Sequence, residues 1–341
     1  MTTPTTNTAQ DVPAPGHDPG KKFALIGAAG FVAPRHMQAI RDTGNVMVAA
    51  LDKSDSVGII DSYFPDAAFF TEFERFDRHV EKLRRERKQH VDYVSICSPN
   101  YLHDAHIRFA LRVGADAICE KPLVVNPWNV EPLADLERET GQRICCILQL
   151  RLHPTIIALK ERIEREGRDT KYDIDLTYIT SRGRWYLQSW KGDIEKSGGV
   201  TMNIGVHFFD MLRWIFGRPS FSNVNVLDET RAAGYLELDK ARVRWFLSLD
   251  RHDLPHTPEP GQPSTYRSIT VDGEEMEFSS GVTDLHTQSY QKILSGEHFT
   301  INDARDAIDV VYGIRTSAPV GLRGEYHPFL VPGNGRAPIN A

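Results

Sequence analysis

Between residue 22 and about residue 150, short apolar or β-branched runs alternate with longer amphipathic stretches, and this alternation restricts the fold more than any other feature. The runs typical of buried strands are residues 23–26, 46–51, 91–97, 116–119 and 144–148. The stretches typical of helices are residues 34–41, 75–88, 102–113 and 130–140. Repeated strand, helix, strand units of this length predict an α/β fold with a doubly wound parallel sheet.

The rhythm changes after a further helix at residues 155–166. Strands are expected at residues 174–181, 223–227, 242–249, 268–271 and 275–278, with Asp272-Gly273 as a hairpin signal. Helices at residues 207–216 and 303–311 are expected to cover one face of this sheet. Strands without intervening helices predict a C-terminal α+β domain with a largely antiparallel, open sheet.

The 341 residues are enough for about two domains. We assign residues 21–150 to the first domain and 151–330 to a second, which we expect to bind substrate and form the oligomer. Residues 1–20, rich in Thr, Pro and Gly, are predicted to be a disordered tail, and residues 331–341 a second tail.

The composition excludes several classes of protein. Forty basic against 46 acidic residues give a net charge of -6, which argues against nucleic acid or a membrane surface as a partner. The first residues lack the apolar core of a secretory signal. The four cysteines lie in strand-like runs without zinc spacing, so we expect reduced thiols, no metal and a cytoplasmic protein.

A glycine-rich turn, Gly27-Ala28-Ala29-Gly30-Phe31-Val32-Ala33, separates the first strand from the first helix. It has one residue more between its glycines than G-x-G-x-x-G, and small residues there let a pyrophosphate approach the helix amides. Asp52, at the end of the second strand, can accept hydrogen bonds from adenosine ribose, which favours NAD over NADP, although Lys53 beside it could accommodate a phosphate. The predicted cofactor-binding residues are Gly27, Ala29, Gly30, Phe31, Val32 and Asp52. The alternative for the glycine-rich turn is a simple reversal of the chain without a ligand. The alternative for Asp52 is an ordinary carboxylate at the end of a strand.

Polar residues follow two further strands of this Rossmann-type sheet. Ser98-Pro99-Asn100-Tyr101-Leu102-His103 follows one strand, and Glu120-Lys121-Pro122 follows the next. Ligands of open parallel sheets bind outside the carboxyl ends of the strands, so both segments are expected to face the crevice that contains Gly30. The neighbouring acid and proline, with a possible cis peptide, hold Lys121 more firmly than a solvated turn lysine, which is the alternative.

Glu120-Lys121-Pro122 and the run Gly198-Gly199-Val200-Thr201-Met202-Asn203-Ile204-Gly205-Val206-His207-Phe208-Phe209-Asp210 resemble two motifs of the Gfo/Idh/MocA oxidoreductase family. The resemblance covers about residues 22–322 and implies that Lys121 and His207 are catalytic and flank the sugar hydroxyl being oxidised. It also implies that the nicotinamide half of the cleft is lined by Ser98, Asn100, His103, Glu120 and Lys121. Asn203 stands where most of the family has Asp, and an amide cannot take a proton.

Asn203 and the segments at residues 149–154, 183–186, 189–193 and 284–290 resemble the WlbA/WbpB subgroup of that family. Those enzymes oxidise the C3 hydroxyl of UDP-N-acetylglucosaminuronate (UDP-2-acetamido-2-deoxy-glucuronate) to a 3-keto sugar with NAD, a step toward lipopolysaccharide sugars. The resemblance implies a homodimer or homotetramer, with 2-oxoglutarate as a reoxidant of NADH in some relatives. The predicted substrate-binding residues are Arg151, Arg184, Trp190, Lys191, Asn203 and His207.

The residues around position 190 suit an anionic sugar nucleotide, because arginine and lysine are interleaved with tryptophan and tyrosine there. A solvated basic loop is the alternative. Either Lys121 or His207 accepts the hydroxyl proton. His207 is favoured as the base, because a histidine is more readily neutral than a lysine at neutral pH. Two other functions stay open: oxidation of another sugar or an inositol-like polyol, and NAD-responsive binding without catalysis.

Overall fold

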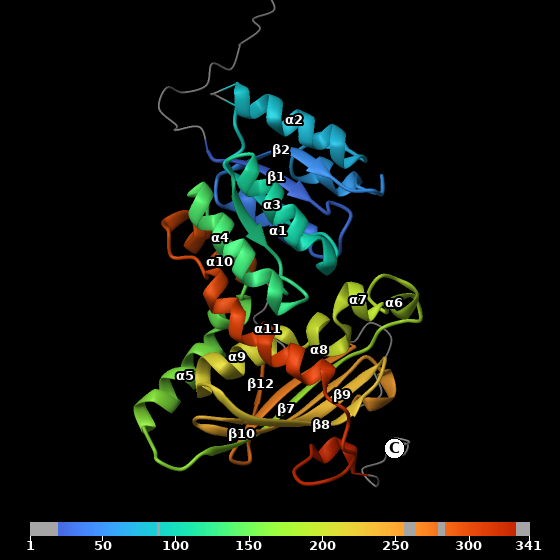
Figure 1. Cartoon of the computed structure of the whole chain (residues 1–341), viewed down its shortest axis with the longest axis vertical. Helices are drawn as coiled ribbons and strands as arrows, with labels where there is room; N and C mark the ends of the chain where they lie inside the picture. Colours follow the sequence, from blue (N-terminus) through green and yellow to red (C-terminus); the bar gives the residue numbers. More distant parts are fainter. Residues whose placement is uncertain (1–19, 87–88, 256–263, 279–283, 332–341) are drawn as a thin grey trace, which may run out of the picture.

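The computed structural model describes residues 20–86, 89–255, 264–278 and 284–331. Two lobes lie one above the other along the long axis of the molecule, with the N-terminal lobe at the top of Figure 1. The predicted tails at residues 1–20 and 331–341 lie outside the described residues, apart from Gly20 and Val331.

The N-terminal lobe is built on a parallel sheet of six strands, which confirms the predicted doubly wound fold. The strands are β1 (Lys22–Ile26), β2 (Val46–Leu51), β3 (Ala68–Phe70), β4 (Tyr93–Ile96), β5 (Asp116–Cys119) and β6 (Ile144–Cys146). Their order is β3-β2-β1-β4-β5-β6, so the chain changes direction across the sheet between β1 and β4. A crevice for a ligand is expected at the carboxyl ends of these two strands.

Four helices accompany this sheet: α1 (Ala33–Asp42), α2 (Phe73–Arg85), α3 (His103–Arg112) and α4 (Val130–Thr140). In α2 the buried side chains are Phe76 and Val80, one turn apart, while most of the helix is charged. This spacing places one apolar stripe against the sheet. The helices predicted at 34–41 and 130–140 agree with α1 and α4 to within one residue at each end.

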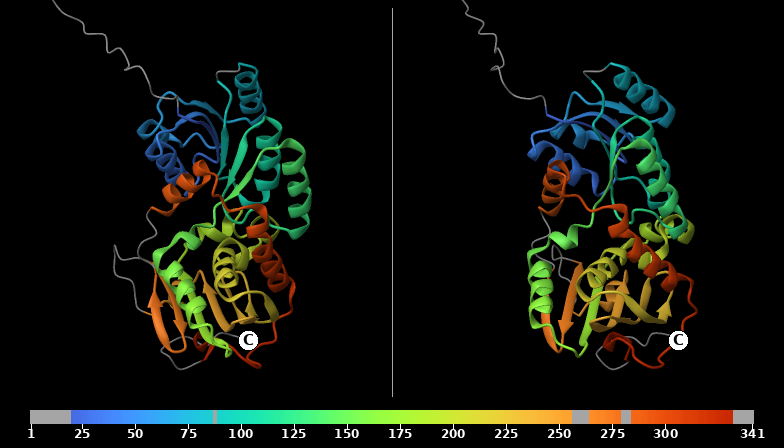
Figure 2. Two further views of the ribbon diagram at one scale, coloured as in Figure 1. Left: turned by 90° about the vertical axis from the view of Figure 1, so that its left-hand side faces the viewer. Right: turned by 60° about the vertical axis from the view of Figure 1, so that its left-hand side comes forward.

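The C-terminal lobe is a second sheet of six strands with helices on one face (Figure 2). Its strands are β7 (Tyr172–Thr180), β8 (Pro219–Leu227), β9 (Arg231–Leu238), β10 (Ala241–Ser248), β11 (Thr265–Val271) and β12 (Glu274–Glu277), in the order β12-β11-β7-β10-β9-β8. The pairing is antiparallel except between β7 and β10, which run parallel. The main helices are α5 (Pro154–Glu166), α9 (Val206–Phe216) and α11 (Ile301–Thr316).

The sequence patterns missed β3, β9 and several helices. The missed helices are α6 (Trp185–Gln188), α7 (Ile194–Ser197), α8 (Gly199–Asn203) and α10 (Leu285–Ser295). Strand β9 contains Ala232, Ala233 and Gly234, which are poor strand formers. Gly234 is needed there because a Cβ atom would lie 2.6 Å from the ring of Trp245. Packing against a buried tryptophan therefore outweighs strand propensity.

Helix α10 is close to the C-terminal end of the chain but packs on α1 in the N-terminal lobe. Tyr290 and Ile293 belong to the same buried cluster as Phe23 and Met37. Figure 2 shows this orange helix beside the blue helices of the N-terminal lobe. Part of the predicted second domain, residues 151–330, therefore packs on the N-terminal lobe.

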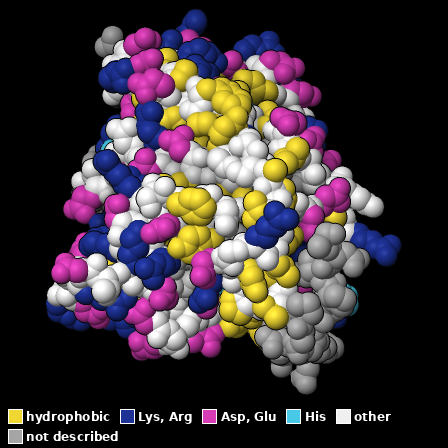
Figure 3. Space-filling model, turned by 60° about the horizontal axis from the view of Figure 1, so that its bottom comes forward, with side chains coloured by type: hydrophobic (Ala, Val, Ile, Leu, Met, Phe, Trp, Pro, Cys, Tyr) yellow, Lys and Arg dark blue, Asp and Glu magenta, His cyan; other side chains and the backbone are white. Residues whose placement is uncertain are grey.

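The surface turned to the viewer in Figure 3 mixes Lys, Arg, Asp and Glu with several hydrophobic patches. All four cysteines lie buried in the structure. Within the described ranges, no helix has the length and apolar character needed to cross a membrane.

Truncation of Phe209 to alanine should destabilise the C-terminal lobe. Phe209 on α9 is buried and packs edge-on against Trp245, with ring centroids 5.2 Å apart. Phe209→Ala should lower the free energy of unfolding by about 3–5 kcal/mol. Phe221→Ala, on the edge strand β8 and half exposed, should change it by about 0.5 kcal/mol. Urea unfolding followed by tryptophan fluorescence measures both, and equal midpoints would contradict this packing.

Candidate active site

The glycine-rich turn lies against the loop that follows β4. Gly27 has a φ of +93°, and a Cβ atom there would lie 2.6 Å from the backbone of Cys97. A Cβ atom on Gly30 would lie 3.0 Å from the carbonyl oxygen of Gly27. Neither position can carry a side chain without a shift of backbone. The turn therefore leaves the bare backbone that a pyrophosphate needs.

Asp52 holds this turn in place. Its Oδ2 accepts a hydrogen bond from the Ala29 N–H at 2.9 Å, and its Oδ1 accepts one from the Ser54 N–H at 2.9 Å. No side chain of the described residues caps the N-terminus of α1, where Val32 is the N-cap residue. Phe31 is 88% exposed at the same end. An uncapped helix N-terminus beside bare backbone is suited to a phosphate group.

Ser98, Asn100 and His103 are mainly engaged with other protein groups. Ser98 Oγ bonds His106 Nδ1 at 2.8 Å. The two ring nitrogens of His103 bond the carbonyls of Ser98 and Pro122, so this histidine ties together the loops after β4 and β5. Asn100 Nδ2 donates to the Ser197 carbonyl at 2.9 Å, which links the two lobes. These hydrogen bonds fix the loops after β4 and β5, and the cofactor role of the three residues stays a prediction.

Lys121 projects from the loop after β5, where the Lys121–Pro122 peptide is cis. Its Nζ donates to the Asn203 carbonyl at 3.2 Å, across the boundary between the lobes. Burial lowers the pKa of Lys121, and Arg267 and Arg182 lower it further, while Glu120 opposes them. Part of the Lys121 population is therefore neutral at a lower pH than for a surface lysine.

His207 lies in the first turn of α9 and is buried. Its ring packs edge-on against Tyr178, with centroids 6.0 Å apart, and its Nδ1 has no partner among the described residues. Burial lowers the pKa of His207 well below the usual value, and the nearby Lys121 and Arg267 add to this effect. The imidazole is therefore neutral at physiological pH.

Asn203 connects several parts of the site. Its Nδ2 donates to the Tyr186 hydroxyl, and its Oδ1 accepts from Asn100 Nδ2 at 3.3 Å. Its carbonyl accepts from Lys121, as described above. The structure thus brings together Lys121, Asn203 and their neighbour His207, all of which the sequence motifs had marked.

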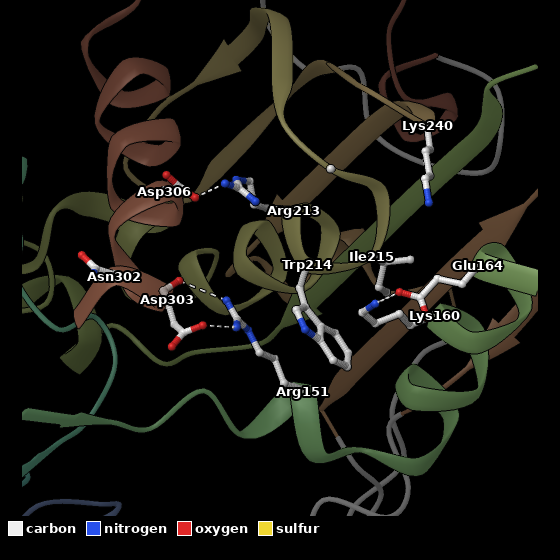
Figure 4. A pocket seen from close by; sticks show the side chains of 11 residues that line it. Arg151, Lys160, Glu164, Arg213, Trp214, Ile215, Lys240, Asn302, Asp303 and Asp306 are labelled. Carbon is white, nitrogen blue, oxygen red and sulfur yellow. Dashed lines mark hydrogen bonds and ion pairs between the residues drawn. The ribbon is translucent and has the colours of Figure 1, made fainter. Parts of the chain in front are cut away.

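Arg151, predicted to bind substrate, has a different environment. Its guanidinium forms an ion pair with Asp210 at 2.7 Å and another with Asp303 at 2.9 Å. It lies at one side of a pocket of about 340 Å³, in which Figure 4 shows its side chain directed at Asp303. Because Asp210 follows His207 by one helical turn on α9, Arg151 fixes that helix. Its charge is thus already paired within the protein, and its role in substrate binding stays a prediction.

The other predicted substrate residues lie around α6. Lys191 Nζ stands 4.4 Å from the ring centroid of Trp190 and 5.5 Å from that of Trp185. Burial and the charge of Arg182 lower the pKa of Lys191. Arg184 is exposed just before α6. A lysine between two indole rings is a surface on which a sugar or a base can stack.

Sequence reasoning missed Tyr178 and Arg267. They face each other across the antiparallel pair β7 and β11, with the guanidinium carbon 5.2 Å from the tyrosine ring centroid. Burial would raise the pKa of Tyr178, but Arg267 and its neighbours outweigh burial and lower it. Arg267 Nε is buried without a partner among the described residues. Only the strand register brings the two together, and no sequence motif encodes it.

A bare glycine turn at the switch point of a doubly wound sheet, together with a lysine and a histidine where two lobes meet, is typical of a nucleotide-dependent oxidoreductase. A family model described as an oxidoreductase family with NAD-binding Rossmann fold matches residues 21–147. Its companion, the C-terminal alpha/beta domain of the same family, matches residues 160–251. The chain belongs to this family, Gfo/Idh/MocA, and NAD is the cofactor of its N-terminal domain.

Solved structures of high similarity include the WlbA (WbpB) dehydrogenase from Thermus thermophilus, with 51% identity and a TM-score of 0.85 over 91% of this chain and 100% of that chain. It was solved with NAD and alpha-ketoglutarate, and also with NAD and UDP-GlcNAcA. Curated relatives include D-glucoside 3-dehydrogenase of Escherichia coli, 28% identical over 39% of this chain. Another is 1,5-anhydro-D-fructose reductase of Ensifer adhaerens, 28% identical over 57% of this chain. The matches span 38% and 56% of those relatives, less than two thirds of either.

An alanine at Gly27 should weaken NAD binding, whereas an alanine at Gly44 should not. Both glycines have a positive φ, 93° and 75°, so each alanine adds about 1–2 kcal/mol of backbone strain. Only at Gly27 does the added Cβ meet other backbone, since Gly44 has open space around it. Calorimetry should give an NAD dissociation constant at least tenfold higher for Gly27→Ala than for Gly44→Ala. Equal affinities would contradict the assigned turn.

Proposed function

We propose that the protein oxidises the C3 hydroxyl of UDP-N-acetylglucosaminuronate to the 3-keto sugar, with NAD as the hydride acceptor. The observation that carries this proposal is the 51% identity, over all of that chain, to a WlbA dehydrogenase solved with NAD and UDP-GlcNAcA. The group around Lys121 and His207 supplies the chemistry that such an oxidation needs.

Lys121 is the better candidate for the base in this reaction. Hydride leaves the sugar carbon for the nicotinamide ring, while the hydroxyl proton must pass to a side chain. His207 is neutral but has a strongly lowered pKa, which makes it a weak proton acceptor. The pKa of Lys121 is lowered toward the working pH, which is the direction that makes a lysine an effective base. The sequence had favoured His207 because the electrostatics of burial are not visible there.

His207 then serves to orient the substrate. Its ring is held between Tyr178 and Phe208, with ring centroids 6.0 and 4.2 Å away. Its unpartnered Nδ1 leaves a polar atom for a neighbouring group. A neutral imidazole fixed by aromatic packing can hold a sugar hydroxyl beside the lysine.

The charges around the site favour an acidic substrate. Arg182 and Arg267 both act on Lys121, and Lys191 has a pKa lowered by Arg182. Several cations close together repel one another, so an anion that enters among them relieves this repulsion. A uronate carboxylate and a diphosphate are anions of this kind. This cluster favours UDP-N-acetylglucosaminuronate over inositol or a free hexose.

The remaining parts of the proposal rest on the same relative. Its complex with NAD and alpha-ketoglutarate supports 2-oxoglutarate as a reoxidant of bound NADH. A role in lipopolysaccharide sugar synthesis, a homodimer or homotetramer and a cytoplasmic location stay predictions.

The direct test mixes the purified full-length protein with NAD and UDP-N-acetylglucosaminuronate and follows absorbance at 340 nm, with and without 2-oxoglutarate. Mass spectrometry of the nucleotide sugar should show the loss of two hydrogens. UDP-N-acetylglucosamine, which lacks the carboxylate, and myo-inositol are the matched comparisons. Faster oxidation of either comparison would overturn the substrate assignment. Absence of any oxidation, with NAD bound, would favour a binding protein.

Lys121→Ala should lower kcat by about 10²–10⁴-fold while NAD still binds, because the base is lost and the cofactor turn is intact. Lys196→Ala, an exposed lysine paired with Asp193, is the control and should keep wild-type activity. In the wild-type enzyme, kcat should rise with pH as Lys121 loses its proton, with a midpoint below the ordinary lysine value of 10.5. Full activity of Lys121→Ala would refute the role of Lys121.

A further inference from the structure

Two residues near the C-terminal end of the chain lie inside the N-terminal lobe. His286 and Tyr290 are one turn apart on α10, and both are buried against α1. His36 on α1 is also buried, with its ring centroid 5.0 Å from that of His286. The proposed reaction uses none of these three side chains, although they lie next to the Glu120-Lys121-Pro122 segment.

A chain of hydrogen bonds connects these residues to Glu120. His286 Nε2 lies 2.8 Å from Glu120 Oε1, and His36 Nε2 lies 3.1 Å from the same oxygen. The Lys121 N–H donates to Glu120 Oε2 at 3.1 Å. Tyr290 extends the chain, because its hydroxyl lies 2.8 Å from His36 Nδ1 and 2.6 Å from Ser95 Oγ.

The direction of each hydrogen bond follows from the charge on Glu120. Burial opposes that charge, but the bonds from His286 and His36 outweigh it and hold the pKa of Glu120 well below its usual value. The pKa of His36 is lowered by burial, so this imidazole is neutral. A neutral His36 that donates from Nε2 must accept at Nδ1, and Tyr290 is the donor there. Ser95 then donates to Tyr290.

We propose that His36 and His286 are positioning residues whose Nε2–H groups hold the buried Glu120 carboxylate in place beside Lys121. Helix α10 thereby supplies a supporting part of the active site from a segment 166 residues away in sequence. The effect of these two histidines on catalysis rests on the proposed function, in which Lys121 is the base.

Other charged and titratable groups surround Glu120 and Lys121. Besides His36 and His286, the groups that face Glu120 from the elements packed around it are Tyr290, His103, Cys97 and Cys119. Burial raises the pKa of both thiols, so they stay neutral. Those acting on Lys121 or lying beside it are Tyr178, Arg182, Arg267 and His207. Glu120 is therefore the main group that favours the charged form of Lys121.

The same three side chains also have the composition of a metal site. Ligand atoms of His36, Glu120 and His286 lie within 4.8 Å of one another. The distances of 2.8 and 3.1 Å from the two histidine Nε2 atoms to Glu120 Oε1 are hydrogen-bond lengths. Protons on the two nitrogens therefore occupy the positions that a metal ion would need. The structure assigns protons to these positions, and bound metal in the purified protein would contradict this assignment.

The experiment compares His286→Leu, which removes a donor, with His286→Gln, which returns an N–H near the position of Nε2. His327→Leu is the control, a histidine equally buried but in the C-terminal lobe. The first readout is the pH dependence of Lys121 acetylation by acetic anhydride in the NAD-bound protein, measured by mass spectrometry. It needs no substrate, so it separates this inference from the proposed function. The second readout is the pH profile of kcat.

With one donor missing, Glu120 takes up a proton more readily and Lys121 loses the neighbouring negative charge. Neutral Lys121 should then appear at lower pH, so the acetylation midpoint in His286→Leu should move down by about one pH unit. His286→Gln should restore the wild-type midpoint, and His327→Leu should not move it. The rising limb of kcat should shift in the same direction.

An unchanged midpoint in His286→Leu would overturn the inference, even if that variant were less stable. A shift that His286→Gln fails to reverse would also overturn it, as would stoichiometric metal in the purified protein. If Lys121 responds as expected but no nucleotide sugar is oxidised, the positioning role stands and the proposed function fails. His36→Leu and His36→Gln repeat the comparison from the other side of Glu120.

Discussion

A carboxylate buried in the interior of a protein can stay ionised only if donors reach it from the elements around it. Glu120 meets this requirement with His36 from α1, His286 from α10 and the N–H of the residue that follows it. Much of the architecture follows from this condition. Helix α10 has to return to the N-terminal lobe to supply His286. The loop that carries Lys121 is held on one side by Glu120 and on the other by the Asn203 carbonyl of the C-terminal lobe.

Most of the N-terminal fold, apart from the short strand β3, could be predicted because two periodicities alternate there. Buried strands such as β6 are continuous apolar runs, and helices such as α2 have one apolar stripe on a charged background. The prediction of helices and strands failed where packing against a residue distant in sequence decides which side chain is present. Gly234 makes room for Trp245 inside β9, and α10 buries polar residues such as His286 that an apolar stripe would not contain.

The active site shows the same division. Motifs marked Lys121, His207 and Asn203, because these residues lie close in sequence to the turns that position them, and the structure brings them together. Arg151 carries the charge expected of a substrate ligand, but its ion pairs with Asp210 and Asp303 could not be foreseen from the sequence. The opposite case is Arg267, which faces Tyr178 through the register of two strands that are distant in sequence. Charge and residue type are visible in a sequence, whereas register and ion-pair partners are not.

The return of α10 also affects how the chain can acquire its structure. Residues 21–150 contain every strand of the first sheet, yet the cluster that covers one face of it includes Tyr290 and Ile293. A ribosome delivers these side chains only after the whole second sheet has been synthesised. Until then the first lobe exposes apolar surface and a carboxylate that lacks one of its donors. The cofactor domain therefore becomes complete only after the second sheet has been made, which couples the maturation of its nucleotide site to that of the lobe that contains this sheet.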